Sequence, residues 1–202
     1  MTQELKTALA DGLTALGLTP PDGAVDRLAL YCDLLLEKNE VMNLTAITDP
    51  AEVVRRHFLD SAALLPARVL QGKRVIDVGT GGGFPGVVLK ILDPSMDLTL
   101  LDSLGKRVDW LRDLCARLEF TGVTCVKGRA EELSRLPDHR EAYDAAVSRA
   151  LASMPVLAEL CLPYVRPGGF FLAMKSNKTD EEIEAARPII GTLGGDVPFV
   201  MD

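Results

Sequence analysis

The chain has 202 residues, 48% of them hydrophobic, and a formal net charge of −7. This length allows one sizeable core, or one domain with a small addition, and is short for two full domains. The negative charge excludes binding to nucleic acid through an overall positive field, although a local basic face is compatible with it.

The beginning of the chain and its cysteines exclude further classes of protein. No apolar run approaches the roughly 20 residues of a membrane span, and MTQELKTALADGL lacks the basic start and apolar block of a signal peptide. We therefore expect a soluble, cytoplasmic protein without membrane contact. The four cysteines lie far apart and only two histidines accompany them. Because metal sites need clustered ligands, we expect no metal ligand and no disulfide framework.

The first part of the chain has a helical pattern. Apolar residues recur at intervals of three and four over the first 66 residues, which predicts three helices. The sequence DPAE predicts the start of the third, with Asp49 as N-cap, Pro50 at the first helical position and Glu52 three residues after the cap. The plausible domain boundary is ARVLQGK, so we expect a helical segment at 1–70 and a second domain at 71–202.

From Arg74 onward, short apolar runs alternate with helical stretches. The expected strands are RVIDV, DLTLLD, GVTCVKG, YDAAVS and GGFFLAMK. The expected helices begin at Pro85, Leu104, Ser153 and Thr179. This alternation is typical of βαβ units. The sequence therefore predicts an α/β fold with a mostly parallel sheet flanked by helices.

Five glycines lie within DVGTGGGFPG, residues 77–86, directly after the first expected strand. In an open parallel sheet, nucleotide-like ligands bind at this place. Missing side chains let a ligand lie against backbone N–H groups, and Pro85 suits the start of the next helix. A tight turn that packs the helix against the strand would explain one or two of the glycines, but hardly five.

The charges around the glycine loop indicate the kind of ligand. GGGFPG also satisfies the dinucleotide pattern G-x-G-x-x-G, but the loop begins with a carboxylate, Asp77, where a pyrophosphate would need positive charge. A second acid, Asp102, ends the next strand and can accept both hydroxyls of a ribose. The pattern D-x-G-x-G-x-G followed by this acid resembles the class I (Rossmann-like) methyltransferases, which bind S-adenosylmethionine. That ligand carries an ammonium and a sulfonium, so nearby carboxylates favour it.

The sequence lacks the residues of two methyltransferase chemistries. After the fourth expected strand it reads VSRALA instead of the N-P-P-Y type motif of exocyclic amine methylation. No cysteine stands in the setting that attack on a pyrimidine carbon uses. A ring nitrogen with its own lone pair needs neither, because alignment and charge stabilisation suffice. A carboxylate on a small molecule would fit these absences equally well.

Several motifs together resemble one family. NLTAI, HFLDS, DVGTGGGFPG, LLDSLGKR, GRAEE and SRA occur in this order and spacing in the bacterial 16S ribosomal RNA guanine-N7 methyltransferases, the RsmG/GidB family. The match runs from about residue 39 to residue 175. The resemblance implies a helical N-terminal part, S-adenosylmethionine as cofactor, and methylation of N7 of a guanine in 16S ribosomal RNA or the small ribosomal subunit. It also implies further C-terminal residues with a sixth strand and an antiparallel seventh, so we expect C-terminal strands to be missing.

The motifs also give the expected site residues. Cofactor contacts are expected from Asp77, Gly79, Gly81, Gly83, Phe84, Asp102, Ala130, Glu131 and Arg149. Arg149 is also the expected catalytic residue, because its place beside the cofactor suits phosphate binding or stacking on a base. Plain packing is an equal alternative for Phe84, and a helix-start acid is the alternative for Glu131.

The substrate side is expected to use basic residues at the rim of the same site. RNA contacts are expected from Arg56, His57, Lys106, Arg107 and Lys175. We expect His57 to support a junction with Asp60, since N7 carries no proton to remove. The guanine would have to be unpaired or extruded. We expect a monomer, and two alternatives stay open: a small-molecule methyltransferase, and a ribosome-associated module that holds the cofactor without activity.

Overall fold

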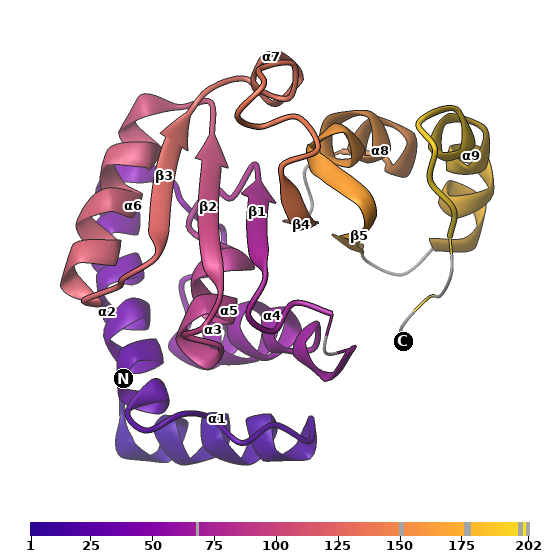
Figure 1. Ribbon diagram of the computed structural model, residues 1–202. Coiled ribbons are helices and arrows are strands. Elements are labelled where there is room, and N and C mark those ends of the chain that lie inside the picture. The colour runs from indigo at the N-terminus through magenta and orange to yellow at the C-terminus, as the bar shows by residue number, and fades with distance from the viewer. Residues whose placement is uncertain (68, 150–151, 176–178, 198–199, 201–202) are drawn as a thin grey trace.

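The computed structural model describes residues 1–67, 69–149, 152–175, 179–197 and 200. Its centre is a sheet of five parallel strands in the order β3-β2-β1-β4-β5 (Figure 1). The strands are β1 (Arg74–Val78), β2 (Asp97–Asp102), β3 (Val123–Lys127), β4 (Tyr143–Arg149) and β5 (Val165–Met174). The expected α/β fold with a parallel sheet is confirmed.

The strand bounds agree with the sequence pattern to within one residue at each end, except at β5. The pattern predicts a start at Gly168, whereas β5 begins at Val165 and pairs there with Tyr143. The register then shifts, so that Ala145 pairs with Phe170. At Gly169 the two backbones come so close that a side chain would collide with the carbonyl of residue 144. The irregularity explains why this stretch, with its turn-forming residues, nevertheless belongs to the strand.

Helices cover both faces of the sheet, and the side chains of β1 alternate between them. Val75 belongs to the core of the first face, whereas Ile76 and Val78 belong to the core of the second. On the first face, α5 (Gly86–Leu92) and α6 (Gly105–Arg117) pack against the strands, α2 (Ala24–Met42) packs on α5, and α1 (Gln3–Ala15) packs on α2. The second is covered by α7 (Ala130–Leu133), α8 (Met154–Cys161) and η3 (Leu162–Tyr164), with α9 (Thr179–Thr192) packed on α8. Figure 1 shows α6 beside β3, and α8 and α9 at the opposite side of the sheet.

The third expected helix is composite. It consists of α3 (Pro50–Val53), a π-helical turn η1 (Val54–Leu59) and α4 (Asp60–Ala62), followed by η2 (Leu65–Ala67). The start signal is confirmed, because the Asp49 carboxylate accepts a hydrogen bond from the Glu52 amide at 3.0 Å. The π turn, which the apolar spacing does not reveal, is a feature often found at functional sites. This segment shares one hydrophobic core with the first face of the sheet, and the domain boundary near residue 71 stays a prediction.

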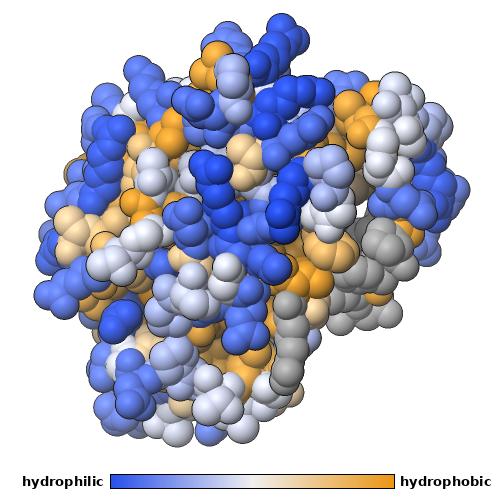
Figure 2. Space-filling model, viewed as in Figure 1, coloured by the Kyte–Doolittle hydropathy of each residue, from blue (hydrophilic) through white to orange (hydrophobic). Residues whose placement is uncertain are grey.

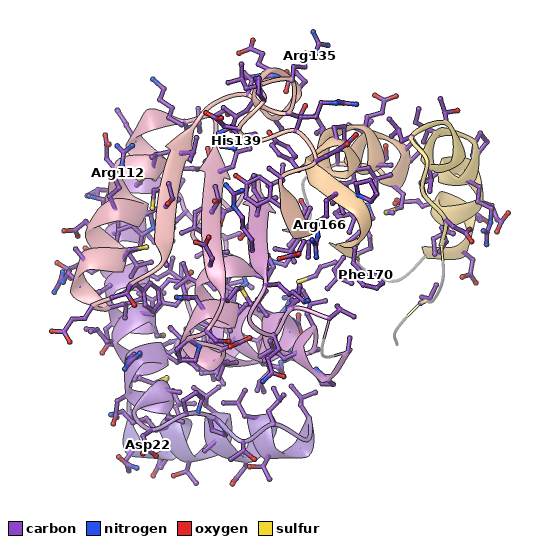
Figure 3. All side chains as sticks on the ribbon, in the orientation of Figure 1. Asp22, Arg112, Arg135, His139, Arg166 and Phe170 are labelled. Carbon is purple, nitrogen blue, oxygen red and sulfur yellow. The ribbon has the colours of Figure 1, made fainter. Side chains whose placement is uncertain are left out.

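The surface carries no dominant apolar area on the face that Figure 2 displays, where hydrophobic atoms lie in small areas among hydrophilic side chains. Arg166 and Phe170 lie on the edge strand β5, while Arg112 lies on α6 at the other side of the sheet (Figure 3). Arg166 is paired with Asp144 at 2.5 Å.

Of the residues that the structure describes, none belongs to a helix both long and apolar enough to cross a membrane.

The close packing of α5 on the sheet predicts the effect of one added methyl group. A Cβ at Gly86 would lie 2.7 Å from the Leu100 Cδ2 atom and 2.8 Å from the Asp77 Oδ2 atom. We expect Gly86→Ala to lower the free energy of unfolding by roughly 2 kcal/mol, measured by urea denaturation. Gly191→Ala, in open space on α9, is the matched control and should be neutral or stabilising by less than about 1 kcal/mol. Equal stabilities of the two variants would contradict this packing.

Candidate functional site

The glycine loop lies where the order of the strands changes direction. β1 is in the middle of the sheet, with β2 on one side and β4 on the other, and the loop connects its carboxyl end to α5. Chain connections leave this point toward opposite faces of the sheet, and in such sheets ligands bind outside the strand ends here. The loop, the end of β2, the start of α7 and the end of β4 therefore border one candidate site.

Asp77 fixes both ends of the loop from below. Its side chain is fully buried, and its Oδ2 atom accepts hydrogen bonds from the Thr80 hydroxyl at 2.6 Å and the Gly86 amide at 2.8 Å. Its Oδ1 atom is buried without a partner. Burial raises the pKa of this carboxyl to about 7, against the lowering effect of both hydrogen bonds. Asp77 thus holds the loop with one oxygen and keeps an unsatisfied acceptor with the other.

Asp102 connects the loop to the end of β2. Its Oδ2 atom accepts a hydrogen bond from the Gly81 amide at 3.1 Å, and its Oδ1 atom accepts one from the Leu104 amide at 2.8 Å. The Arg107 guanidinium lies 3.7 Å from the same carboxylate. Each carboxylate oxygen has a second lone pair, so Asp102 can still accept two hydroxyl groups from a ligand. Arg107, expected at the RNA rim, is placed beside the cofactor acid.

The amide groups of the loop are largely engaged within the protein. The Gly79 and Thr80 amides both donate to the Leu101 carbonyl, at 2.9 and 3.1 Å. The Gly83 and Phe84 amides donate to the Thr80 carbonyl, at 2.9 and 3.0 Å. A phosphate-binding loop needs such amides to point at the anion. The loop therefore suits a ligand that does not require a cluster of free amides.

Gly83, an expected cofactor contact, has a packing reason of its own. Its φ angle is +109°, and a Cβ there would lie 2.7 Å from the Tyr31 hydroxyl and 2.8 Å from Val87. Gly83 and Gly86 are therefore the two glycines of the loop that close packing of the helix against the strand explains. A contact between the ligand and Gly83 stays a prediction.

The start of α7 lies next to Asp102. The Gly128 amide donates to the Asp102 carbonyl at 3.1 Å, which brings the following residues to the end of β2. Ala130 is the first residue of α7. Glu131 is exposed and forms an ion pair with Arg129 at 2.8 Å, and hydrogen bonds from its own amide and from Arg129 lower its pKa. Both readings of Glu131 remain compatible with this place, so its cofactor contact stays a prediction.

Arg149 and Phe84 form a stack at the end of β4. The Arg149 guanidinium lies 4.7 Å from the centre of the Phe84 ring and donates to the Arg56 carbonyl at 3.1 Å. Burial lowers the pKa of Arg149. Phe84 is only 5% exposed and also stacks with Tyr31 and His57, at centroid distances of 5.2 and 4.4 Å. Phe84 is thus packed within an aromatic cluster that Arg149 covers at the end of β4, and its contact with the cofactor stays a prediction.

His57 lies inside this cluster instead of on the rim. Its ring is 9% exposed, its Nε2 atom is 2.7 Å from the Thr45 hydroxyl, and its Nδ1 atom is buried without a partner. Burial lowers its pKa to about 4, and the nearby Arg149 charge acts in the same direction. The junction expected with Asp60 is wrong: Asp60 is exposed, and Thr45 is the partner. His57 is neutral near pH 7, and its contact with RNA stays a prediction.

The remaining basic residues are not all free. Lys175 forms an ion pair with Glu182 at 2.8 Å and donates to the Ala152 carbonyl at 2.9 Å, so its charge is already paired. The sequence does not reveal this, because Glu182 comes from α9, whereas Lys175 follows β5. Arg56 and Lys106 have exposed side chains. The structure thus brings Arg56 to Arg149, leaves Lys106 at the start of α6, and engages Lys175 within the fold.

The sequence patterns do not predict three residues of the site. Thr80 and Thr45 are the hydroxyl partners of Asp77 and His57. Tyr31 of α2 donates a buried hydrogen bond to the Gly82 carbonyl at 2.8 Å. Of these, only Tyr31 gives a signal, because a tyrosine within an apolar stripe must find a partner for its hydroxyl.

The donor set fits a cationic ligand with a ribose. Asp77 offers a buried, unpartnered carboxylate oxygen, and Asp102 offers spare acceptor capacity. Both acids repel a phosphate, and the amides that would bind one are engaged. Among the described residues, no group of three or more histidine, cysteine or acidic side chains is arranged to hold a metal ion. S-adenosylmethionine has the charge and the hydroxyls that this arrangement favours.

Comparison with known proteins gives matches over nearly the whole chain. A family model described as "GidB: rRNA small subunit methyltransferase G" matches residues 24–200. The "Ribosomal RNA small subunit methyltransferase G" of Alkaliphilus metalliredigens is 48% identical over 195 residues, which are 96% of this chain and 82% of that protein. The protein of the same name from Symbiobacterium thermophilum is 51% identical over 193 residues, covering 93% of this chain and 78% of its own.

Solved structures bear on the fold. A SAM dependent methyltransferase from Aquifex aeolicus is similar with a TM-score of 0.52 at 18% identity, over 75% of this chain and 86% of its own. A ribosomal protein L11 methylase from Lactobacillus delbrueckii subsp. bulgaricus is similar with a TM-score of 0.53 at 15% identity, over 73% of this chain and 72% of its own. At these identities the likeness shows the fold alone, and it agrees with the class I arrangement.

The buried carboxyl of Asp77 predicts a dependence of stability on pH. Its pKa of about 7 exceeds the value of about 4 in an unfolded chain, so the folded state binds the proton more tightly. Relative to Asp77→Asn, which does not titrate, the free energy of unfolding of the wild type should therefore fall as pH rises from about 4 to about 8, by at most roughly 4 kcal/mol. Urea denaturation at several pH values measures this difference. A difference that is constant, or that grows in favour of the wild type, would contradict the assignment.

Proposed function

The chain belongs to the GidB family of rRNA small subunit methyltransferases, and we propose that it performs the reaction of this family at the site described above. The enzyme transfers a methyl group from S-adenosylmethionine to N7 of a guanine in 16S ribosomal RNA. The observation that carries the assignment of the site is the pair of acids around the glycine loop, Asp77 and Asp102, one with an unpartnered oxygen and the other with spare lone pairs.

We assign the cofactor-binding roles as follows. Asp102 accepts the ribose hydroxyls, and the start of α7 at Ala130 borders the adenine. The carboxylate of Asp77 favours the positive charge of the cofactor through space and holds the loop in its bound shape. When bound, S-adenosylmethionine supplies an electrophilic methyl group on its sulfonium. Support for these roles comes from the place of Asp77 and Asp102 at the carboxyl ends of β1 and β2 and of Ala130 shortly after β3.

On the substrate side, the residues of the chain orient a base and need not remove a proton. N7 of guanine has a free lone pair, so alignment and electrostatic stabilisation can supply the catalysis. Arg149 is the group we propose for this purpose, because it lies at the end of β4 and has guanidinium donors beyond the one that binds the Arg56 carbonyl. The neutral His57 beneath it supports the Phe84 ring on which Arg149 stacks.

We propose that RNA approaches from the side of η1 and the start of α6. Arg56 and Lys106 are exposed there, and Arg56 adjoins Arg149 through its carbonyl. The target guanine has to be unpaired or turned out of a helix to bring N7 to the methyl group. We further propose that the enzyme acts as a monomer in the cytoplasm.

A labelling experiment tests the reaction and both alternatives. The protein is incubated with methyl-labelled S-adenosylmethionine and either small ribosomal subunits, naked 16S ribosomal RNA or a metabolite pool, and the RNA is digested to nucleosides. We expect the label in 7-methylguanosine from small-subunit RNA, because the site has the residues for a ring nitrogen. Label only in metabolites would indicate the small-molecule alternative. No transfer despite cofactor binding would indicate a binding module.

Removal of the charge of Asp102 should weaken cofactor binding. Asp102→Asn keeps the size of the side chain but places one amide donor where a hydroxyl group or the Gly81 amide needs an acceptor. We expect the dissociation constant for S-adenosylmethionine to rise by roughly 10- to 100-fold, measured by calorimetry. Asp109→Asn is the matched control, since Asp109 is exposed on the same helix that follows Asp102. Unchanged affinity of Asp102→Asn would refute the ribose role.

A further inference from the structure

The chain has three tyrosines, and all of them are buried. Tyr31, Tyr143 and Tyr164 each have 0% relative exposure. A buried phenol hydroxyl normally needs a hydrogen-bond partner, and the partner tells what the hydroxyl holds in place. Two of the three hydroxyls bind backbone carbonyls at the candidate site, whereas the third does not.

Tyr31 reaches the glycine loop from α2 on the first face of the sheet. Its hydroxyl donates to the Gly82 carbonyl at 2.8 Å, and its ring stacks with Phe58 and Phe84 at 5.5 and 5.2 Å. The same hydroxyl occupies the space that a side chain at Gly83 would need. Burial raises the pKa of Tyr31 well above its usual value, so the hydroxyl remains a donor.

Tyr164 reaches the start of α7 from η3 on the second face. Its hydroxyl donates to the Ala130 carbonyl at 2.8 Å, and burial raises its pKa. That carbonyl also accepts the Ser134 amide at 3.1 Å, so the tyrosine strengthens the first turn of a helix of only four residues. A turn this short has little stability of its own and depends on such tertiary contacts.

The two carbonyls flank one acid. Gly81, next to Gly82, donates its amide to the Asp102 Oδ2 atom, and Gly128, two residues before Ala130, donates its amide to the Asp102 carbonyl. The loop and the start of α7 are therefore both attached to Asp102, and each is held by a tyrosine from a different face of the sheet.

We propose that Tyr31 and Tyr164 are positioning residues of the cofactor site, whose hydroxyls fix the two backbone segments on either side of Asp102. This inference rests on the proposed cofactor site. It assigns a role in that site to the N-terminal helical segment through Tyr31 and to the η3 turn through Tyr164. Neither tyrosine needs to touch the cofactor, because each acts through the backbone that it holds.

Tyr143 supplies the matched control. Its hydroxyl lies 2.7 Å from the His139 Nδ1 atom, and the Arg74 guanidinium covers its ring at 4.7 Å. Tyr143 begins β4 and Arg74 begins β1, so this cluster lies at the amino ends of the strands, away from the glycine loop. A Tyr143→Phe change removes an equally buried hydroxyl that binds neither backbone segment, and it keeps the ring that packs edge-on against Tyr164 at a centroid distance of 6.0 Å.

The experiment compares Tyr31→Phe, Tyr164→Phe and Tyr143→Phe by calorimetric titration with S-adenosylmethionine and by thermal unfolding. We expect the dissociation constant to rise roughly tenfold in each of the first two variants, because each leaves a carbonyl of the site without its tyrosine partner. The Tyr143→Phe variant should change the dissociation constant by less than about twofold, even where its melting temperature falls as much as that of the other two variants.

The outcomes separate this inference from the proposed function. Unchanged affinity for S-adenosylmethionine in Tyr31→Phe and Tyr164→Phe, or an equal loss of affinity in all three variants, would overturn the positioning role. Binding of S-adenosylmethionine by the wild type would still support the proposed cofactor site in that case. A wild-type protein that binds no S-adenosylmethionine would overturn both. If one of the two variants does not fold, the dissociation constant of the other is still compared with that of Tyr143→Phe. Each phenylalanine keeps the ring of the tyrosine, so the aromatic packing stays in place.

Discussion

One buried carboxylate, that of Asp77, sets the shape of the site. Its Oδ2 atom binds the Thr80 hydroxyl and the Gly86 amide, so a single atom closes the loop between β1 and α5. The closed loop then places the Gly81 amide against Asp102. A buried carboxylate is costly unless it is compensated, and its Oδ1 atom lacks a partner. The fold thus keeps a partly compensated acid, with one unpartnered oxygen and a pKa raised to about 7 by burial, at the place where we propose that a cationic ligand binds.

The N-terminal helical segment is part of the site, and its aromatic side chains explain why. Tyr31 and His57 lie against Phe84, which follows the glycines, and Arg149 of β4 covers the same ring. Arg149 also binds the carbonyl of Arg56 within the π turn, where the regular hydrogen-bond ladder is interrupted. The segment and the sheet therefore meet around one phenylalanine, so a displacement of either would move the arginine proposed for catalysis.

The parts of the structure with a local cause were predictable from the sequence. The strands follow from apolar runs, the third helix from the cap at Asp49, and the place of the glycine loop from the βαβ pattern. What failed depends on contacts between distant segments. His57 meets Thr45 instead of Asp60, and the register shift in β5 depends on the approach of Gly169 to β4. No spacing along the chain contains such information, because the partners are chosen by packing.

The charge of the site also bears on the proposed entry of RNA. The acids that favour a sulfonium repel phosphate groups, and the loop amides that could bind a phosphate are engaged with the Leu101 and Thr80 carbonyls. The chain as a whole is negative, so attraction to an RNA backbone needs local exposed cations, which is the role that we propose for Arg56 and Lys106. A base, which is uncharged, can enter where its phosphates cannot. These electrostatics support the proposal that the acceptor is a nucleobase turned away from its backbone.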